Sequence, residues 1–170
     1  MIRRLVHCRR RGQFRFRKTI TMGHKFFNRV PVSLMVQKGC LIRLYGDLIE
    51  ECYISKNVLV CVMQLKPTNE SDTYRIKIRY KLSERSPKAW MVSPEIKKVD
   101  GKYPHHIYGW DNGHPQLCVY YPGFSEWTQQ MDIATTFIPW ILTWLNTYEY
   151  WVITGKWHYD EAPRRIELNT

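Results

Sequence analysis

The clearest structural signal in the sequence is residues 73–82, which read TYRIKIRYKL. Aromatic and aliphatic side chains alternate there with Arg and Lys in strict period two, at Tyr74, Ile76, Ile78 and Tyr80. Successive side chains of an extended strand point to opposite faces. The alternation therefore predicts a strand with one buried face and one solvated, cationic face.

Similar but weaker signals flank this strand on both sides. Short apolar runs bounded by turn residues occupy residues 47–54, 58–65 and 89–96, and such runs are typical of strands. Their order and short connections predict a four-stranded antiparallel meander. A helix is expected before the first strand, over residues 31–45, because Pro31 suits the first position of a helix.

The C-terminal half is rich in aromatic residues, and 15 of the 24 lie between Tyr103 and Tyr159. Apolar residues recur at i, i+3 and i+4 spacing over residues 133–152, which predicts an amphipathic helix packed on the sheet. Gly155 is expected to cap its C-terminus. Residues 103–122 are expected to form a long irregular loop before it. The predicted fold class is α+β, a four-stranded antiparallel meander with flanking helices.

The formal net charge of +11 is concentrated in one segment of the 170-residue chain. Residues 1–29 contain ten Lys and Arg and no acidic residue, which leaves 16 basic against 15 acidic residues elsewhere. We therefore expect a basic N-terminal arm at 1–29 and one domain at 30–170. The arm fits a solvated tail, a contact with nucleic acid or an acidic partner, or a transit sequence. Nucleic-acid binding is disfavoured, because its basic footprint should lie along the fold itself.

Cysteine usage and hydropathy point to a reducing compartment. The five cysteines are an odd number without metal-type spacing, and the Arg-rich N-terminus lacks the apolar segment of a secretory signal. The longest apolar stretches, such as residues 137–142, are too short to span a bilayer. A cytoplasmic protein with free thiols and no membrane attachment is the expectation.

Reactive side chains are concentrated in residues 105–118, HHIYGWDNGHPQLC. Three hypotheses fit this segment. Cys118 could be a nucleophile whose pKa is lowered by a nearby histidine; the histidines and Cys118 could bind zinc; or Cys118 could be a small buried apolar residue. The spacing matches no closed zinc site, so no metal is predicted. The sequence contains no phosphate-binding loop or dinucleotide fingerprint, and no cofactor is expected.

The order of these elements and four short motifs resemble the ubiquitin-conjugating enzyme fold. That family has a His-Pro-Asn motif, a glycine shortly before its catalytic cysteine, and a tryptophan after it. The counterparts in this sequence are His106-Ile107-Tyr108, Gly113, Leu117-Cys118-Val119 and Trp127. More specifically, the chain resembles the bacterial branch found in antiphage CBASS operons, with matching stretches at residues 64–68, 74–80, 117–122 and 138–157.

This resemblance implies a cysteine-dependent protein-conjugating enzyme. Cys118 would carry the C-terminus of a partner protein as a thioester and pass it to an amine, so that one difficult transfer becomes two easier ones. The implied partner is a cGAS/DncV-like nucleotidyltransferase of the same operon, primed by conjugation during antiviral defence. Because the sequence shows no adenylation domain, a separate activating protein would charge Cys118, or the partner would arrive already activated.

Roles for the residues around Cys118 also follow from the resemblance. His106 would orient the loop or accept a proton, and Tyr108, Asn112 or a backbone N–H would stabilise the oxyanion. His105 and Trp127 are further candidates for support of the site. Adjacent residues of an extended loop point in opposite directions, so only one of the two histidines faces the cysteine.

One departure from the family pattern supports an alternative. Tyr108 stands where the family has the asparagine that helps to stabilise the oxyanion. An inactive member of the same fold, which binds a peptide or a C-terminal tail without chemistry, would tolerate this change. Cys118 would then be structural.

Overall fold

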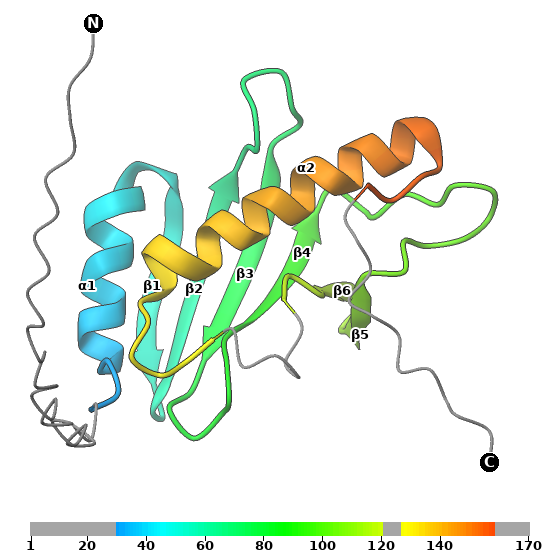
Figure 1. Cartoon of the computed structure of the whole chain (residues 1–170). Coiled ribbons are helices and arrows are strands. Elements are labelled where there is room, and N and C mark those ends of the chain that lie inside the picture. Colours follow the sequence, from blue (N-terminus) through cyan, green and yellow to red (C-terminus); the bar gives the residue numbers. More distant parts are fainter. Residues whose placement is uncertain (1–29, 121–126, 159–170) are drawn as a thin grey trace, which may run out of the picture.

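The computed structural model describes residues 30–120 and 127–158 (Figure 1). The described residues form a six-stranded antiparallel sheet and two α-helices. The strand order is β1-β2-β3-β4-β6-β5. The elements along the chain are α1 (Leu34–Tyr45), the 3-10 turn η1 (Gly46–Leu48), β1 (Ile49–Ser55), β2 (Val58–Leu65), β3 (Tyr74–Tyr80), β4 (Lys88–Ser93), β5 (Ile107–Asp111), β6 (His114–Leu117), the π-helical turn η3 (Ile133–Phe137) and α2 (Ile138–Thr154).

The strand predicted from alternation is confirmed as β3, at the centre of the meander. Its four apolar side chains are at most 2% exposed, whereas the cations between them are half-buried on the opposite face. Helix α2 crosses the face of the sheet (Figure 1), and Tyr74 of β3 packs edge-on against Tyr148 of α2. The hydrophobic core thus lies between one face of the sheet and α2.

The predicted four-stranded sheet is too small, because two further strands continue it. Strands β1 to β4 pair consecutively and antiparallel, and β6 then pairs with β4 and β5. Part of the expected irregular loop is therefore a hairpin. Its turn has positive φ at Asn112 (50°) and Gly113 (79°), the backbone that Asn-Gly favours in two-residue hairpins.

Both predicted helices are present, with small changes at their ends. Helix α1 begins at Leu34, after Ser33, whose hydroxyl accepts a hydrogen bond from the Val36 N–H at 3.3 Å. The expected C-terminal cap of α2 is confirmed: Gly155 has a φ of 72°, and its N–H donates to the Trp151 carbonyl at 2.8 Å.

Helix α1 is joined to the segment before α2 by one buried polar side chain. Gln37 is fully buried; its amide donates to the Met131 carbonyl and accepts from the Ile133 N–H, both at 2.8 Å. The amino group and the carbonyl oxygen of this buried amide therefore each have a protein hydrogen-bond partner. Within the described parts of the chain, no helix has the length and apolarity needed to cross a membrane. The predicted arm at residues 1–29 lies outside them.

Candidate active site

Cys118 follows the last residue of β6 and extends its pairing with the strand beside it. The Cys118 N–H donates to the His106 carbonyl at 3.1 Å, next to the registered pair of Ile107 and Leu117. Leu117 is 2% exposed and anchors this end of the hairpin in the core. Cys118 itself is half-buried, so its position is fixed while its thiol stays near the surface.

His106 connects Cys118 to helix α2. Its carbonyl oxygen also accepts a hydrogen bond from the indole N–H of Trp144, at 2.9 Å. Its imidazole stacks on Trp157, with ring centroids 4.6 Å apart and ring planes 21° apart. The same indole contacts the ring of Trp144. His106 thus holds the cysteine backbone, α2 and the segment after α2 together.

Tyr108 faces Cys118 because β5 contains a bulge. The pairing of β5 with β6 shifts between Ile107 and Gly109, so Tyr108 is the extra residue, and bulges beside sites often redirect a side chain in this way. Its hydroxyl donates to the backbone carbonyl of Tyr120. A side-chain hydrogen bond also links Tyr108 with Cys118.

The acidity of Cys118 reflects two opposing effects. Burial raises the pKa of the thiol above its ordinary value of 9.0, and the hydrogen bond with Tyr108 lowers the pKa in part. The thiol donates to the Tyr120 carbonyl at 3.8 Å. At neutral pH Cys118 is therefore mostly protonated, and Tyr108 is placed to stabilise the thiolate when it forms.

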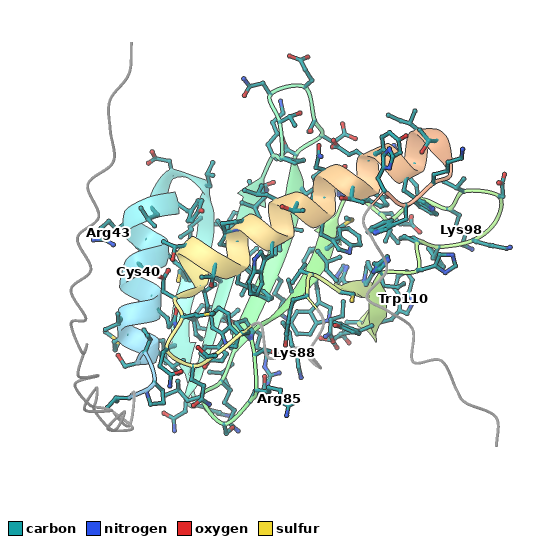
Figure 2. The ribbon with its side chains drawn as sticks, viewed as in Figure 1. Cys40, Arg43, Arg85, Lys88, Lys98 and Trp110 are labelled. Atoms are coloured by element: carbon teal, nitrogen blue, oxygen red, sulfur yellow. The ribbon has the colours of Figure 1, made fainter. Side chains whose placement is uncertain are left out.

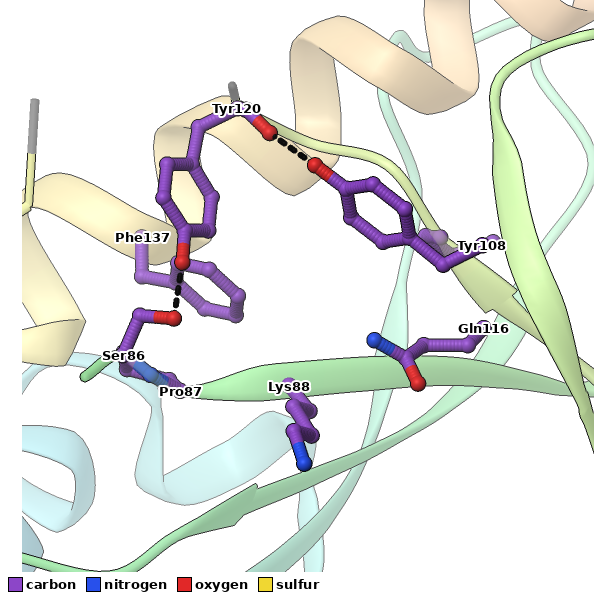
Figure 3. Close-up of a pocket in the computed structure, with 8 residues that line it drawn as sticks. Ser86, Pro87, Lys88, Tyr108, Gln116, Tyr120 and Phe137 are labelled. Carbon is purple, nitrogen blue, oxygen red and sulfur yellow. Dashed lines mark hydrogen bonds between the residues drawn. The ribbon is translucent and has the colours of Figure 1, made fainter. Parts of the chain in front are cut away.

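A cavity of about 190 Å³ is lined by Tyr108 and Tyr120, two residues that are hydrogen-bonded with the Cys118 thiol (Figure 3). Its walls come from the start of β4, the bulge of β5, the end of β6 and the segment before α2, namely Ser86, Pro87, Lys88, Tyr108, Gln116, Leu117, Tyr120 and Phe137. The Tyr120 hydroxyl is hydrogen-bonded to the Ser86 side chain across one wall. Cys118 is not itself one of the residues that line the cavity; its connection to the cavity runs through the hydrogen bonds with Tyr108 and Tyr120.

Among the polar side chains that line this cavity, the Tyr108 hydroxyl and the Gln116 amide are the candidates to face a reacting carbonyl (Figure 3). The sequence analysis did not identify Gln116. Its position two residues before the cysteine was visible, but its contact with the cavity depends on the pairing of β6 with β4 through Trp90. Lys88 also lines the cavity, and its ammonium group lies 3.9 Å from Glu84.

Three of the predicted site residues are not brought to the thiol. His105 is exposed. Asn112 lies in the hairpin turn, beyond the opposite end of the four-residue β6, whose length alone is ~13 Å at 3.3 Å per residue, so Asn112 is farther than that from Cys118. Trp127 is 4% exposed in an aromatic cluster with Phe137 and Trp140, so its role in the described structure is core packing.

The zinc hypothesis requires at least three suitable ligands in one place. Among the residues that the structure describes, no group of three or more His, Cys, Asp or Glu side chains could hold a metal ion. Cys118 instead has neighbours that suit covalent chemistry, namely a phenol and a cavity.

An antiparallel sheet with α2 across one face, and a half-buried cysteine at the end of its added hairpin, fits the class of E2-like proteins. A family model described as "Type II CBASS E2 protein" matches residues 37–165, well over half of the chain. The chain therefore belongs to this family. A comparison with curated proteins finds no match. The E2 name denotes conjugating activity in general, and the CBASS context associates the chain with the proteins of CBASS operons.

Proposed function

We propose that this chain is a cysteine-dependent protein-conjugating enzyme of CBASS antiviral defence. It carries the C-terminus of a partner protein as a thioester on Cys118 and transfers it to an amine. The observation that carries the proposal is the placement of Cys118 in a chain of this family: a half-buried thiol hydrogen-bonded with Tyr108, which lines a cavity of about 190 Å³.

The reaction has two acyl-transfer steps. In the first, the Cys118 thiolate attacks the activated C-terminal carbonyl of the partner, the activating group leaves with its bonding electrons, and a thioester forms. In the second, an amine attacks the thioester carbonyl, loses a proton, and expels the thiolate as an amide forms. The carboxylate must arrive activated, either from a separate activating protein or from a partner that is already activated.

Tyr108 and Gln116 supply hydrogen-bond donors for these steps. Each step creates negative charge on the carbonyl oxygen, and preorganised donors in a partly enclosed site stabilise such charge. In this structure the Tyr108 hydroxyl donates its only proton to the Tyr120 carbonyl, so it must exchange that acceptor for the oxyanion as the reaction proceeds, whereas the Gln116 amide lines the same cavity. We assign these two side chains to the oxyanion in place of Asn112, because Asn112 lies at the far end of the hairpin.

His106 acts as a positioning residue in this proposal. Its carbonyl binds both the Cys118 N–H and the Trp144 indole N–H, and its ring is stacked on Trp157. These contacts fix the direction from which the thiol approaches the carbonyl, and such orientation contributes much of the rate of an acyl transfer.

The proposed partner is a cGAS/DncV-like nucleotidyltransferase of the same operon, whose C-terminus is conjugated to a cellular amine. Its support is the family match, since CBASS membership associates the chain with CBASS operon proteins. Conjugation would prime that enzyme to make cyclic-nucleotide signals during infection in the cytoplasm.

Intact-protein mass spectrometry without reducing agent tests the proposal. The chain is co-expressed with the nucleotidyltransferase of its operon as wild type, Cys118→Ala and Cys118→Ser. Cys40→Ser, a change at a half-buried cysteine of α1, is the matched control. We expect a thiol-labile adduct of partner size on the wild type and on Cys40→Ser, a thiol-resistant ester on Cys118→Ser, and none on Cys118→Ala.

The opposite result would favour the binding-module hypothesis. If no variant carries an adduct and the partner copurifies equally well with Cys118→Ala, the protein binds the partner without acyl transfer. In that case Cys118 is structural.

A further inference from the structure

A pair of thiols lies at the opposite edge of the sheet from the candidate active site. Cys52 of β1 is directly opposite Cys61 of β2 in the strand register. Such partners have Cα atoms about 4.5–5.5 Å apart, within the range of about 4.4–6.8 Å that a disulfide bridges. Both cysteines are free thiols in the structure. The backbone pairing alone therefore brings the two side chains within bonding reach.

The two thiols differ in exposure. Cys61 has no exposed surface, whereas Cys52, on the edge strand, is half-buried. A small oxidant in solution therefore reaches Cys52 first, and Cys61 becomes accessible only through its partner. In a redox-active dithiol, the exposed thiol reacts with the oxidant and the buried thiol then resolves the product as a disulfide. The partial exposure of Cys52 and the burial of Cys61 fit these two roles.

The electrostatic environment has the same asymmetry. The hydrogen bond with Cys61 lowers the pKa of Cys52, burial opposes this, and the positive charge of Lys38 on α1 lowers it again. The same hydrogen bond, together with burial, raises the pKa of Cys61. Cys61 thus remains a thiol that donates its proton toward the Cys52 sulfur. The thiolate that peroxide attacks forms preferentially on Cys52.

We propose that Cys52 and Cys61 form a peroxide-responsive dithiol, a modification site separate from Cys118. The Cys52 thiolate attacks one oxygen of hydrogen peroxide, hydroxide leaves, and Cys52 becomes a sulfenic acid. The Cys61 sulfur then attacks the Cys52 sulfur, and the hydroxyl group leaves with the Cys61 proton as water. Two thiols and one peroxide thus give one disulfide and two waters.

The dithiol is remote from the candidate active site. Strand β1 forms one edge of the sheet, and β6, which precedes Cys118, is four strands away, ~19 Å at the usual spacing between strands. Cys40 on α1 and Trp110 on β5 lie toward opposite sides of the molecule (Figure 2). Oxidation of the pair therefore leaves Cys118 chemically free, and the inference stands whether or not the conjugation proposal holds.

Peptide mapping of the full chain after peroxide treatment tests the inference. The reduced, desalted protein is titrated with hydrogen peroxide, its remaining thiols are capped with N-ethylmaleimide, and it is digested without reductant. We expect a mass lower by two hydrogen atoms, a loss of two capped thiols, and a linked peptide pair containing Cys52 and Cys61. Cys118 should remain capped.

Three variants sharpen the result. Cys40→Ser is the control and should form the linked peptide like the wild type. Cys61→Ser should stop at a sulfenic acid on Cys52 that dimedone captures, and Cys52→Ser should lose no thiol at the same peroxide dose.

The wild-type protein alone can overturn the inference, so the test does not depend on folding of the variants. If Cys52 oxidises to the sulfinic acid without a linked peptide, Cys61 is not its resolving thiol. If Cys40 or Cys118 oxidises before Cys52, the pair has no preferential reactivity.

Discussion

The two cysteine regions of this molecule are built in different ways. Cys52 and Cys61 are brought together by strand register, which six residue pairs between β1 and β2 fix. Cys118 lies on a hairpin that joins the rest of the sheet through one registered pair, and its surroundings depend on side chains. Register is robust to single substitutions, whereas a site held by a few side-chain hydrogen bonds is not. Substitutions near Cys118 should therefore change its reactivity and leave Cys52 unaffected.

The thiols of the two regions also differ in the direction in which their pKa is shifted. Burial raises the pKa of Cys118, whereas a neighbouring thiol lowers the pKa of Cys52. A low pKa alone would therefore favour Cys52 over Cys118 as the candidate nucleophile. The Tyr108 hydroxyl, which is hydrogen-bonded with Cys118 and lines the cavity, is what distinguishes Cys118.

The largest effect is expected from removing the helix side chain that holds the hairpin. Trp144 is 4% exposed and stacked on Tyr148, so Trp144→Ala should lower the free energy of unfolding by ~3–5 kcal/mol. Trp144→Phe keeps most of the ring but loses the N–H that binds the His106 carbonyl, and should cost ~1–2 kcal/mol. Urea denaturation measures both changes.

The Trp144→Phe variant also tests the comparison of the two cysteine regions. Trp144→Phe should speed the alkylation of Cys118 and leave that of Cys52 unchanged, because only the hairpin loosens. Equal rates for Cys118 in this variant and in the wild type would mean that the indole hydrogen bond does not hold the site.

Loss of the Tyr108 hydroxyl should have the next largest effect. The rate at which iodoacetamide alkylates wild-type Cys118 should keep rising with pH through 9 and above, because the pKa of this thiol is raised. The alkylation rate of Cys52, whose pKa is lowered, should reach its plateau at lower pH. Tyr108→Phe should slow the alkylation of Cys118 about 10- to 100-fold at neutral pH, since a hydrogen bond to a charged group contributes ~1.5–3 kcal/mol. An unchanged Cys118 profile would remove Tyr108 from the proposed mechanism.

Substitution of His106 separates positioning from proton transfer. His106→Phe preserves a flat ring against Trp157 and removes the imidazole nitrogens, so adduct formation should stay within about 3-fold of the wild type. His106→Ala removes the stacking, whose value of ~0.5–1.5 kcal/mol predicts a loss of up to about 10-fold. If both variants lose activity equally, the imidazole acts chemically and the positioning role is incorrect.

The smallest effect is expected at Asn112. Asn112→Gly keeps the turn, because glycine adopts the positive φ of 50° without cost, and should leave adduct formation unchanged. Asn112→Ala should destabilise the hairpin by ~1 kcal/mol with only a minor loss of adduct. A large loss of adduct in Asn112→Gly, with stability intact, would return Asn112 to the oxyanion site.

Much of the central fold could be predicted from local sequence patterns. The alternation in residues 73–82 located β3, and helical spacing with Gly155 located α2 and its end. The hairpin was missed because residues 107–117 do not alternate cleanly, although Asn112-Gly113 is itself a hairpin signal. A turn signal inside a segment rich in Gly, Pro and His was outweighed by the irregular composition around it.

The site was predictable only in part. Cys118 and His106 were identified from the resemblance to the E2-like family, and the structure links them through a backbone hydrogen bond. The contact of Tyr108 with Cys118 depends on a bulge, and the cavity contact of Gln116 depends on which strand pairs with β6. Both are properties of strand pairing between segments distant in sequence, and no single segment encodes them.

The most direct test of the central claim is to map the acylated residue in the partner adduct. The adduct formed on co-expression is capped with N-ethylmaleimide under denaturing conditions, digested without reductant, and compared between wild type and Cys118→Ser. The account predicts that the C-terminal peptide of the partner is joined to the Cys118 peptide and released by hydroxylamine, while Cys52 and Cys61 are capped. Acylation at Cys52, or a Cys118 that is fully capped in the adduct, would contradict it.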